Sequence, residues 1–197
     1  MSNMYPFYGL EGRRVKLIPL ELAHTQALYD CSRYPEVWEN YPTTISTIEK
    51  MEQFVHNALV SREQGDQFPY VVFDKELNKI VGTTRYLRIS EANTNLNIGS
   101  TWYSPVVWRT SVNTESKYLL LSYAFENLHV NRVEIITTTT NERSQKAIER
   151  LGAIREGLLR MKYNNLDYVI YSIIDSEWSD VKGRLERFLE DDYYSER

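Results

Sequence analysis

The stretch LNIGSTWYSPVVWRTSVNTESKYLLLSYAFENL, residues 96–128, decides the fold. Residues 96–103 are predicted to form a strand. A loop follows over residues 104–112. After it, apolar residues recur at helical spacing and predict a helix over residues 113–127, with this stripe: Leu120, Leu121, Ala124, Phe125 and Leu128. The stretch therefore predicts a strand that runs through a loop into a helix.

Upstream of this stretch, alternation and periodicity predict a strand at 14–18, helices at 21–33 and 47–62, and strands at 68–73 and 79–88. Ser46 and Glu49 have the spacing of a capping box for the second helix. Residues 74–78 read as the turn between the two strands.

Downstream, the pattern predicts a strand at 133–139 and a helix at 143–151 that ends at Gly152, a common C-cap residue. A hairpin of residues 154–163 and 166–174 turns at Asn164-Asn165. A helix at 176–189 follows, and we expect the charged tail, 190–197, to fray.

The order of these elements predicts an α+β fold. Strands outnumber helices and come in a hairpin-connected run before the central helix, whereas a doubly wound sheet alternates strands and helices regularly. The length of 197 residues suits one domain, with a core at about residues 12–189. We therefore predict a single domain with one central mixed, mostly antiparallel sheet flanked by helices.

Composition narrows the partners. Hydrophobic residues make up 42% and charged residues 25%, and the net charge is −4. An acidic chain with scattered Lys and Arg is not expected to bind nucleic acid through its phosphates. No apolar run approaches the roughly 20 residues of a membrane span, and the first ten residues lack a signal-peptide pattern. We expect no membrane partner.

The single cysteine, Cys31, fits a reducing compartment, so we expect a cytoplasmic protein. We interpret Cys31 as a small buried residue of the predicted helix at 21–33, not as a nucleophile. The three histidines, His24, His56 and His129, lie far apart and lack metal-ligand spacing, so no metal is expected.

The loop-to-helix junction at residues 108–116 is the first candidate site. The first turn of a helix leaves N–H groups unpaired and carries partial positive charge, and such an end binds phosphate oxygens. Small residues at Thr110, Ser111 and Asn113 let a pyrophosphate approach the backbone. An ordinary N-cap is the alternative interpretation.

The second candidate is Asn141-Glu142-Arg143-Ser144, which follows a predicted strand and opens a helix. Asn141 is placed to cap that helix, and a cap alone is one interpretation. The other is that Asn141 binds the amide of a ligand while the Ser144 hydroxyl, one turn along, faces a reaction centre.

These two segments, in this order and separation, resemble the GNAT superfamily of N-acetyltransferases, and within it the RimL/RimJ-like branch. The phosphate loop of that superfamily reads Gln/Arg-x-x-Gly-x-Gly/Ala, and Trp108, Ser111 and Asn113 stand at its three marked positions. Both glycines are therefore replaced by small polar residues.

The branch also has an Asn-x-x-Ser that opens a helix ending in Leu-Gly, followed by Glu-Gly-x-x-Arg. Residues 141–144, 151–152 and 156–160 match these motifs. The likeness covers residues 12–189 and is strongest from Ile98 onward.

The resemblance implies direct transfer of an acetyl or related acyl group from acetyl-CoA to an amine, without a metal. It implies Ser144 as the proton donor to the leaving thiolate, Asn141 as a contact of the pantetheine arm, and a backbone N–H near Trp102 or Tyr103 as the oxyanion donor. The implied cofactor-binding residues are Trp102, Tyr103, Trp108, Arg109, Thr110, Ser111, Val112, Asn113, Asn141 and Ser144.

The connection between the first two helices, residues 34–41, is expected to border the acceptor amine. Glu36, Trp38 and Tyr41 are its predicted substrate-binding residues, since aromatic rings and acids suit a cationic or peptide-like amine. We predict that Trp38 lines this acceptor pocket.

The sequence does not identify the general base. Many relatives carry a Glu just before Ile-Gly on the fourth strand, and this chain has Asn97 there. Glu36, Glu39 and Glu156 are the remaining candidates.

Other functions compete with catalysis. Asn97 and the missing glycines favour a non-catalytic acyl-CoA-binding or sensing module, while Asn141 and Ser144 favour an enzyme. A purely structural domain and another donor, such as succinyl-CoA, are further alternatives. The acceptor, a protein N-terminus, another peptide or a small-molecule amine, is left open, as is a homodimer.

Overall fold

The computed structural model describes residues 6–41 and 43–195. Its strands are β1 (Leu10–Glu11), β2 (Val15–Pro19), β3 (Gln67–Asp74), β4 (Lys79–Ser90), β5 (Asn95–Tyr103), β6 (Arg132–Thr138), β7 (Ile154–Tyr163) and β8 (Leu166–Ile174). Its α-helices are α1 (Thr25–Cys31), α2 (Pro35–Trp38), α3 (Ile48–Glu63), α4 (Val112–Ser122), α5 (Glu142–Leu151) and α6 (Trp178–Ser195). Short helical turns are η1 (Leu22–His24), η2 (Pro105–Val107), η3 (Tyr123–Asn127) and η4 (Asp175–Glu177).

The strands form one sheet in the order β1-β2-β3-β4-β5-β6-β8-β7. Among the described strands, β5 and β6 are the only parallel neighbours, and the other pairs are antiparallel. Helix α4 lies in the connection between β5 and β6, as a parallel pair requires. The predicted α+β class with a mixed, mostly antiparallel sheet is confirmed.

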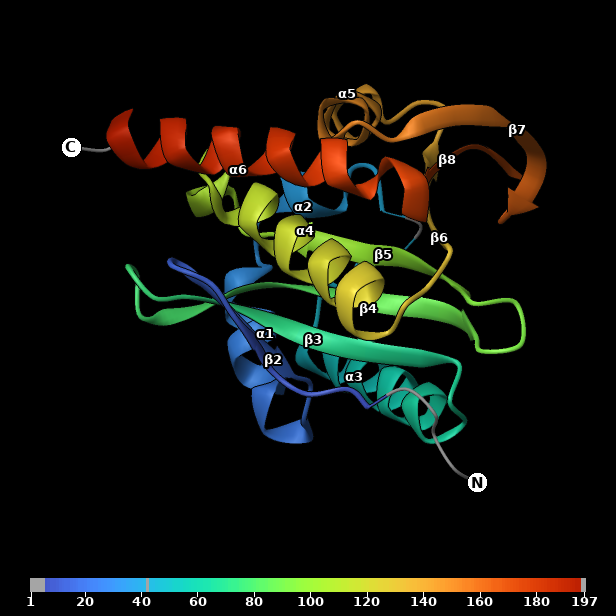
Figure 1. Ribbon diagram of the computed structural model, residues 1–197. Coiled ribbons are helices and arrows are strands. Elements are labelled where there is room, and N and C mark those ends of the chain that lie inside the picture. Colours follow the sequence, from blue (N-terminus) through green and yellow to red (C-terminus); the bar gives the residue numbers. More distant parts are fainter. Residues whose placement is uncertain (1–5, 42, 196–197) are drawn as a thin grey trace.

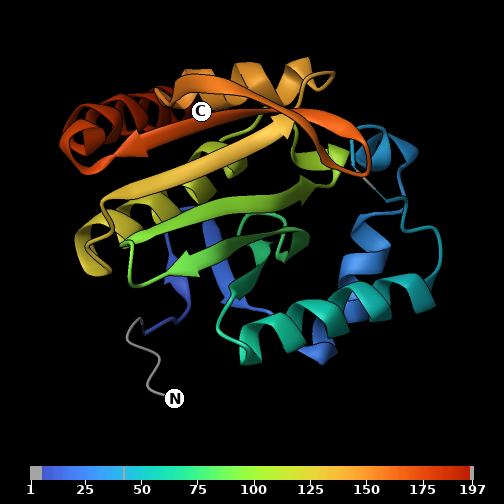
Figure 2. The same ribbon diagram turned by 90° about the vertical axis from the view of Figure 1, so that its right-hand side faces the viewer.

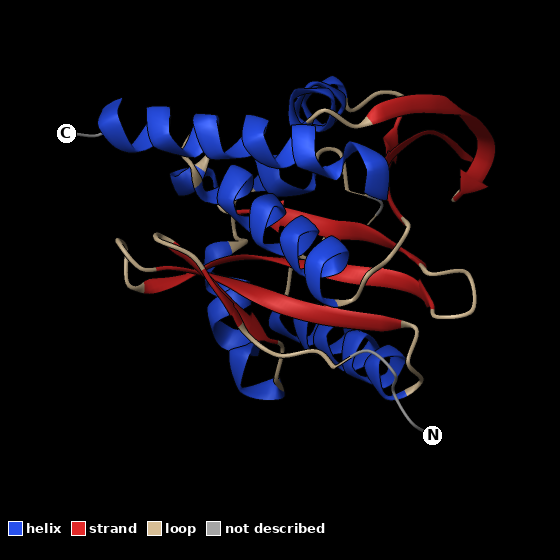
Figure 3. Cartoon of the chain, viewed as in Figure 1, coloured by secondary structure: helices blue, strands red, loops and turns tan. Residues whose placement is uncertain are grey.

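Helices cover both faces of the sheet (Figures 1 and 3). Helices α4, α5 and α6 pack on one face and contribute to the larger core cluster with Leu120, Ile148 and Leu185. Helices α1, α2 and α3 pack on the other face around Leu28 and Met51. Within the described residues, no helix is long and apolar enough to cross a bilayer.

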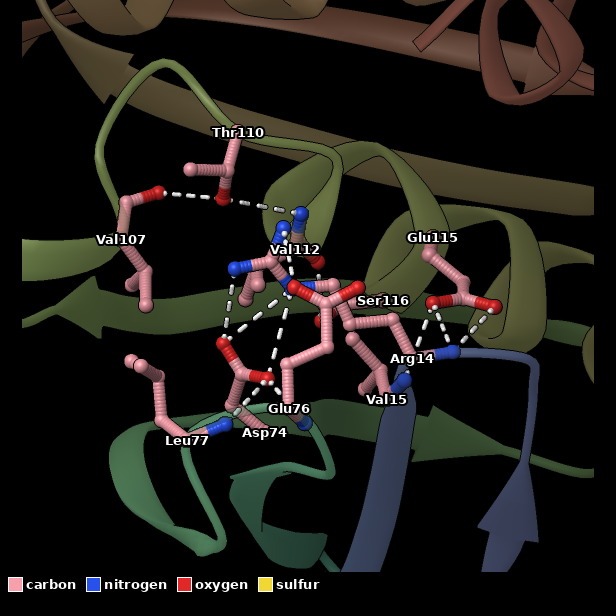
Figure 4. A network of polar contacts seen from close by, with 10 residues as sticks. All are labelled: Arg14, Val15, Asp74, Glu76, Leu77, Val107, Thr110, Val112, Glu115 and Ser116. Atoms are coloured by element: carbon pink, nitrogen blue, oxygen red, sulfur yellow. Dashed lines mark hydrogen bonds and ion pairs between the residues drawn. The ribbon is translucent and has the colours of Figure 1, made fainter. Parts of the chain in front are cut away.

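A buried carboxylate fastens α4 to the N-terminal strands. The Glu115 side chain, 3% exposed, accepts a hydrogen bond from the backbone N–H of Arg13. It also accepts from the backbone N–H groups of Arg14 at 3.0 Å and Val15 at 2.9 Å (Figure 4). Gly12 completes the site, because an added Cβ there would lie 2.3 Å from Glu115 Oε1. Glu115 therefore fixes where α4 begins relative to the sheet.

A buried ion pair joins Arg14, just before β2, to Asp74 at the end of β3. The Arg14 guanidinium donates to Asp74 at 3.0 Å, and Asp74 is fully buried. Asp74 Oδ1 also accepts the backbone N–H groups of Glu76 and Leu77 (Figure 4). The predicted turn at 74–78 is thus held by its first residue.

Most predicted elements form within a few residues of their expected bounds, and the hairpin of 154–163 and 166–174 matches them, with Asn164 and Asn165 at positive φ. Gly152 caps α5 with φ of 104°. The capping box was wrong, because Thr47, not Ser46, accepts the Lys50 N–H at the start of α3.

Two further expectations are corrected. The segment 34–41, expected to be a loop, contains the short helix α2, which Pro35 starts at its first position. Helix α6 continues as far as Ser195 through the tail that was expected to fray, and residues 196–197 lie outside the described residues.

We expect Glu115→Ala to lower the free energy of unfolding by at least about 3 kcal/mol, because three N–H groups lose their acceptor and each costs about 1–3 kcal/mol when buried unpaired. Urea unfolding at pH 7 measures it. Glu52→Ala, at an exposed position of α3, is the control and should change stability by less than about 0.5 kcal/mol. Equal losses in the two variants would contradict the anchoring role.

Candidate active site

Strands β5 and β6 separate shortly after they meet. They pair over three positions, Asn95–Arg132, Leu96–Val133 and Asn97–Glu134. Beyond these, β5 runs on to residue 103 and β6 to residue 138, and the two diverge toward their C-terminal ends (Figure 2). Backbone groups along both facing edges are therefore left without a strand partner.

A β-bulge marks the separation on β5. Residues 83 and 85 of β4 pair with residues 102 and 99 of β5, so Ser100 and Thr101 oppose the single residue Thr84. Ser100 has a φ of 46°. The extra residue reverses the alternation of side chains: Thr101 faces α4, and Trp102 joins the core beside α1–α3.

A cavity of about 920 Å³ occupies this separation and opens to the surface. All ten predicted cofactor-site positions except Ser111 and Val112 line it. Ser111 and Val112 are buried beneath its wall. The structure thus brings together two segments about thirty residues apart in sequence, the start of α4 and the start of α5.

The start of α4 has the features of an anion site. Helix α4 begins at Val112, and the Glu115 N–H is bonded to the Ser111 carbonyl. The N–H groups of the first turn precede that bond and have no acceptor within the helix. Among the described atoms, the buried Ser111 Oγ has no hydrogen-bond partner. A phosphate at this end would meet N–H donors and the helix dipole.

Trp108 and Arg143 build one wall at this end of the cavity. Trp108 Nε1 donates to the Tyr103 carbonyl at 2.9 Å, which holds the ring on β5. The Arg143 guanidinium lies 4.0 Å from the centre of the Trp108 ring, a cation–π contact between α5 and the loop. Trp108 therefore positions the Arg143 guanidinium, a group that can bind a phosphate through two hydrogen bonds.

Asn141 and Ser144 open α5 and both line the cavity. Asn141 Oδ1 accepts the Ser144 N–H at 3.0 Å, so Asn141 is the N-cap of α5. Because the cap uses the amide oxygen, the amide NH2 of Asn141 is the group left for a ligand. The Ser144 side chain is half-buried beside it.

The charges in the cavity wall differ from those of the chain as a whole. The chain carries a net charge of −4. Among the described residues that line the cavity, four are basic and one is acidic: Arg88, Arg109, Lys117, Arg143 and Asp66. A basic cleft in an acidic protein attracts an anionic ligand.

Lys117 was not predicted as a site residue. It lies one helical turn after Asn113 on α4, is 6% exposed, and its Nζ donates to Thr101 Oγ1 at 3.1 Å. Burial lowers the pKa of Lys117 to about 7. The only signal in the sequence was the spacing of four from Asn113, which places both side chains on one face of the helix.

The predicted acceptor residues separate into two groups. Tyr41 lines the cavity, and its hydroxyl donates to Ser100 Oγ at the bulge, at 3.2 Å. Glu36 is exposed on α2 and does not line the cavity. Trp38 lies in the core instead of the cavity wall, with its Nε1 donating to the Ser32 carbonyl and its ring against Trp102.

Trp38 lies in the core because the segment around it forms the short helix α2. A loop would leave alternate side chains free to point outward, but a helical turn directs both Val37 and Trp38 inward. Tyr163 and Tyr168 of the β7–β8 hairpin line the cavity as well. Sequence reasoning placed them in the hairpin without assigning a site role, because the hairpin is distant in sequence from residues 34–41.

None of the three candidate bases lines the cavity. Glu39 is exposed, like Glu36. Glu156 binds Arg132 and Ser172, and these contacts lower its pKa to about 2. Asn97 does line the cavity, at the last position where β5 and β6 pair. Asp66 is the one carboxylate among the described residues that line the cavity.

Metal and cysteine chemistry find no support in the described residues. They contain no group of three His, Cys, Asp or Glu residues close enough to hold a metal ion. Burial raises the pKa of the Cys31 thiol to about 12, which keeps it protonated. The cleft is built of backbone edges, helix starts, hydroxyls and cations.

Comparisons with known proteins agree with this geometry. The family model of the acetyltransferase (GNAT) domain matches residues 14–154. The chain is 27% identical over 174 residues to the uncharacterized N-acetyltransferase p20 of Bacillus licheniformis, covering 84% of this chain and 96% of p20. It is 33% identical over 98 residues to YdaF of Bacillus subtilis (strain 168), provisionally named a ribosomal N-acetyltransferase, covering 48% of this chain and 53% of YdaF.

A crystal structure of a GCN5-related N-acetyltransferase from Brucella melitensis superposes with a TM-score of 0.86 at 28% identity, covering 94% of this chain and 86% of that one. The protein therefore belongs to the GNAT family of N-acetyltransferases. This family uses acetyl-CoA as its acyl donor, and the basic, phosphate-ready cleft fits that donor.

We expect Trp38→Ala to destabilise the protein by about 3–5 kcal/mol, the usual cost of truncating a buried Trp. Urea unfolding measures it. In the fraction of Trp38→Ala that folds, KM for the amine and for acetyl-CoA should stay near the parent's values, since the ring does not line the cavity. Tyr41→Phe is the matched control from the wall, and a selective rise of the amine KM in Trp38→Ala would contradict the core placement.

Proposed function

We propose that this protein transfers an acetyl group from acetyl-CoA to a primary amine by direct attack. The observation that carries the proposal is the cavity at the β5–β6 separation, which joins the start of α4 to the start of α5. A donor with a phosphate end and a thioester end requires such a span, because one end needs helix N–H groups and the other needs a hydrogen-bonding strand edge.

Different segments of the cavity wall bind different parts of the acyl donor. The first turn of α4, with Arg109 and Arg143 nearby, receives the pyrophosphate. The Asn141 amide NH2 contacts the pantetheine arm. The thioester lies against the bulged edge of β5, where a backbone N–H near Trp102 or Tyr103 binds the carbonyl oxygen.

The chemical step conserves atoms and protons. The amine nitrogen forms a bond to the carbonyl carbon, the carbonyl oxygen holds negative charge, and the carbon–sulfur bond then breaks. The acceptor ammonium loses one proton to water before the attack, and the bonded nitrogen loses a second proton to water afterwards, which leaves a neutral amide. The Ser144 hydroxyl donates its proton to the leaving thiolate and regains one from water. A CoA thiol of ordinary pKa, about 8.5, leaves more readily with that help.

The acceptor enters from the side of α2. Tyr41, Tyr163 and Tyr168 supply aromatic surface there, and Asp66 supplies a negative charge at the rim. A wall of this kind suits an amine that arrives as a cation on an extended chain. The partial likeness to YdaF supports a peptide N-terminus as the first acceptor to test, ahead of small-molecule amines.

A non-catalytic acyl-CoA-binding module is the second candidate, and Asn97 favours it, because this position of the wall lacks a carboxylate. Both candidates bind the donor, so binding does not separate them. Release of CoA thiol in the presence of amines does, because only the enzyme consumes the thioester.

We expect acetyl-CoA to stabilise the protein against heat, since a ligand present at about 100 times its Kd adds about 2.7 kcal/mol.

Asn113→Asp should weaken binding by placing a carboxylate at the proposed phosphate site. Isothermal titration with the parent and the variant measures both Kd values. Asp66→Asn, at the opposite rim, is the control and should leave the donor Kd unchanged. An unchanged Kd in Asn113→Asp would move the phosphate site elsewhere.

We expect Ser144→Ala to lower kcat by roughly 10-fold or more, because general acid help is typically worth about 10²–10⁴-fold. The Kd for acetyl-CoA should change little. Thiol release over a panel of peptide and small-molecule amines gives kcat. The variant's melting temperature is recorded alongside, because Ser144 also lies in the first turn of α5. Full kcat on a genuine acceptor would reduce Ser144 to a helix-start residue.

A further inference from the structure

Lys117 is a buried lysine without a carboxylate partner among the described residues. Its Nζ has one hydrogen bond, to Thr101 Oγ1 at 3.1 Å, and Thr101 is in turn bonded to Thr84 at 2.8 Å. Desolvation is the cause of its lowered pKa, with no nearby charge contributing. An unpaired buried ammonium costs free energy, so its retention points to a counter-charge that arrives with a ligand.

Lys117 lies on the donor side of the cavity. It comes from α4, and Ser144 comes from α5 on the same face of the sheet, where Arg150 Nη2 bonds Thr114 at 2.6 Å and ties the two helices together. The acceptor wall with Tyr41 approaches from the α2 side. Lys117 therefore reaches the bulge of β5 from the face that holds the acyl donor.

The charged groups around Lys117 are engaged or distant. On its own helix, Glu115 is bound by backbone N–H groups of residues 13–15. On α6, Glu186 accepts from Tyr118, and Lys182 pairs with Glu126. Strand β5 contributes the Tyr103 phenol, whose pKa burial raises. Elsewhere in the described cavity wall the charged residues are Asp66, Arg88, Arg109 and Arg143.

We propose that Lys117 is a catalytic residue that acts on the acyl donor, its ammonium group stabilising the negative charge that forms on the thioester carbonyl oxygen during transfer. This role rests on the proposed acetyl transfer. Thr101 is the positioning residue, because its hydroxyl holds Nζ at the bulge where the strand edge is free.

The step needs no proton from Lys117. As the amine attacks, the carbonyl electron pair moves to oxygen, and the ammonium offsets that charge. As the carbon–sulfur bond breaks, the pair returns and the charge passes to sulfur beside Ser144. Lys117 keeps its three protons throughout, so it must be charged when the donor binds.

This requirement fixes a pH dependence. With a pKa of about 7 in the free enzyme, Lys117 is charged below pH 7 and neutral above it. The value of kcat/KM should therefore fall as pH rises through about 7. Deprotonation of the acceptor amine raises kcat/KM around the pKa of that amine. Arginine stays protonated throughout, so Lys117→Arg should lose the alkaline fall.

The experiment compares pH profiles of kcat/KM for the parent, Lys117→Met, Lys117→Arg and the exposed control Lys146→Met, with one peptide amine and with acetyl-CoA or succinyl-CoA as the donor. We expect Lys117→Met to fall by roughly 100-fold, the lower end of the loss for one oxyanion donor. We expect Lys117→Arg to keep more activity than Lys117→Met and to lack the alkaline fall. Lys146→Met, on the outer face of α5, should match the parent.

A second readout does not depend on turnover. Because the lysine pKa is lower in the folded than in the unfolded protein, the folded state binds fewer protons between about pH 7 and 10.5. The urea midpoint of Lys117→Met should exceed the parent's most below pH 7, and this excess should vanish toward pH 10.5. This result also shows that the variant is folded.

The outcomes separate the two proposals. A parent that neither binds nor consumes acetyl-CoA refutes acetyl transfer itself. A parent that turns over while Lys117→Met keeps its rate and alkaline fall refutes only the role of Lys117. A loss in Lys117→Met confined to succinyl-CoA also overturns it, because Lys117 would then pair with the acyl carboxylate. Lys117→Arg no better than Lys117→Met, with the alkaline fall intact, overturns it too.

Discussion

The three-position pairing of β5 with β6 is the constraint on which the rest of the structure depends. A parallel pair that continued to Tyr103 and Thr138 would close the sheet and satisfy both edges. Instead the bulge at Ser100 and Thr101 turns β5 away, and the backbone groups beyond Asn97 face a cavity. The separation places a strand edge, which can bind a carbonyl oxygen, inside a protein interior where hydrogen bonds are strong.

The helices around this separation are held by contacts that a sheet alone would not provide. Glu115 fastens the start of α4 to β2 through backbone N–H groups, and Arg150 ties α5 to α4 through Thr114. The two helix starts therefore keep a fixed spacing across the cavity. Positioning of this kind is a large part of catalysis by direct transfer, because the reactants lose freedom before the reaction.

Two buried charges show how stability and function divide. The Glu115 carboxylate accepts hydrogen bonds from three backbone N–H groups, so its burial contributes to the fold. Lys117 has a single hydroxyl partner and a lowered pKa, so its burial weakens the fold. Both lie on α4, two residues apart, on opposite sides of the helix. One side attaches the helix and the other serves the cavity.

The sequence by itself determined most of the elements, the α+β class and the two helix starts whose residues line the cavity. Periodicity and cap residues act over a few residues, and these features depend on neighbours along the chain. The Asn141 cap of α5, the Gly152 end and the Asn164-Asn165 turn are examples, each formed as expected. Tertiary structure decided which side chains meet. Trp38 turned inward because α2 is helical, and Lys117 became a cavity residue because β5 bulges toward α4. Burial of a charge and separation of two strands depend on segments distant in the chain, and no local pattern records them.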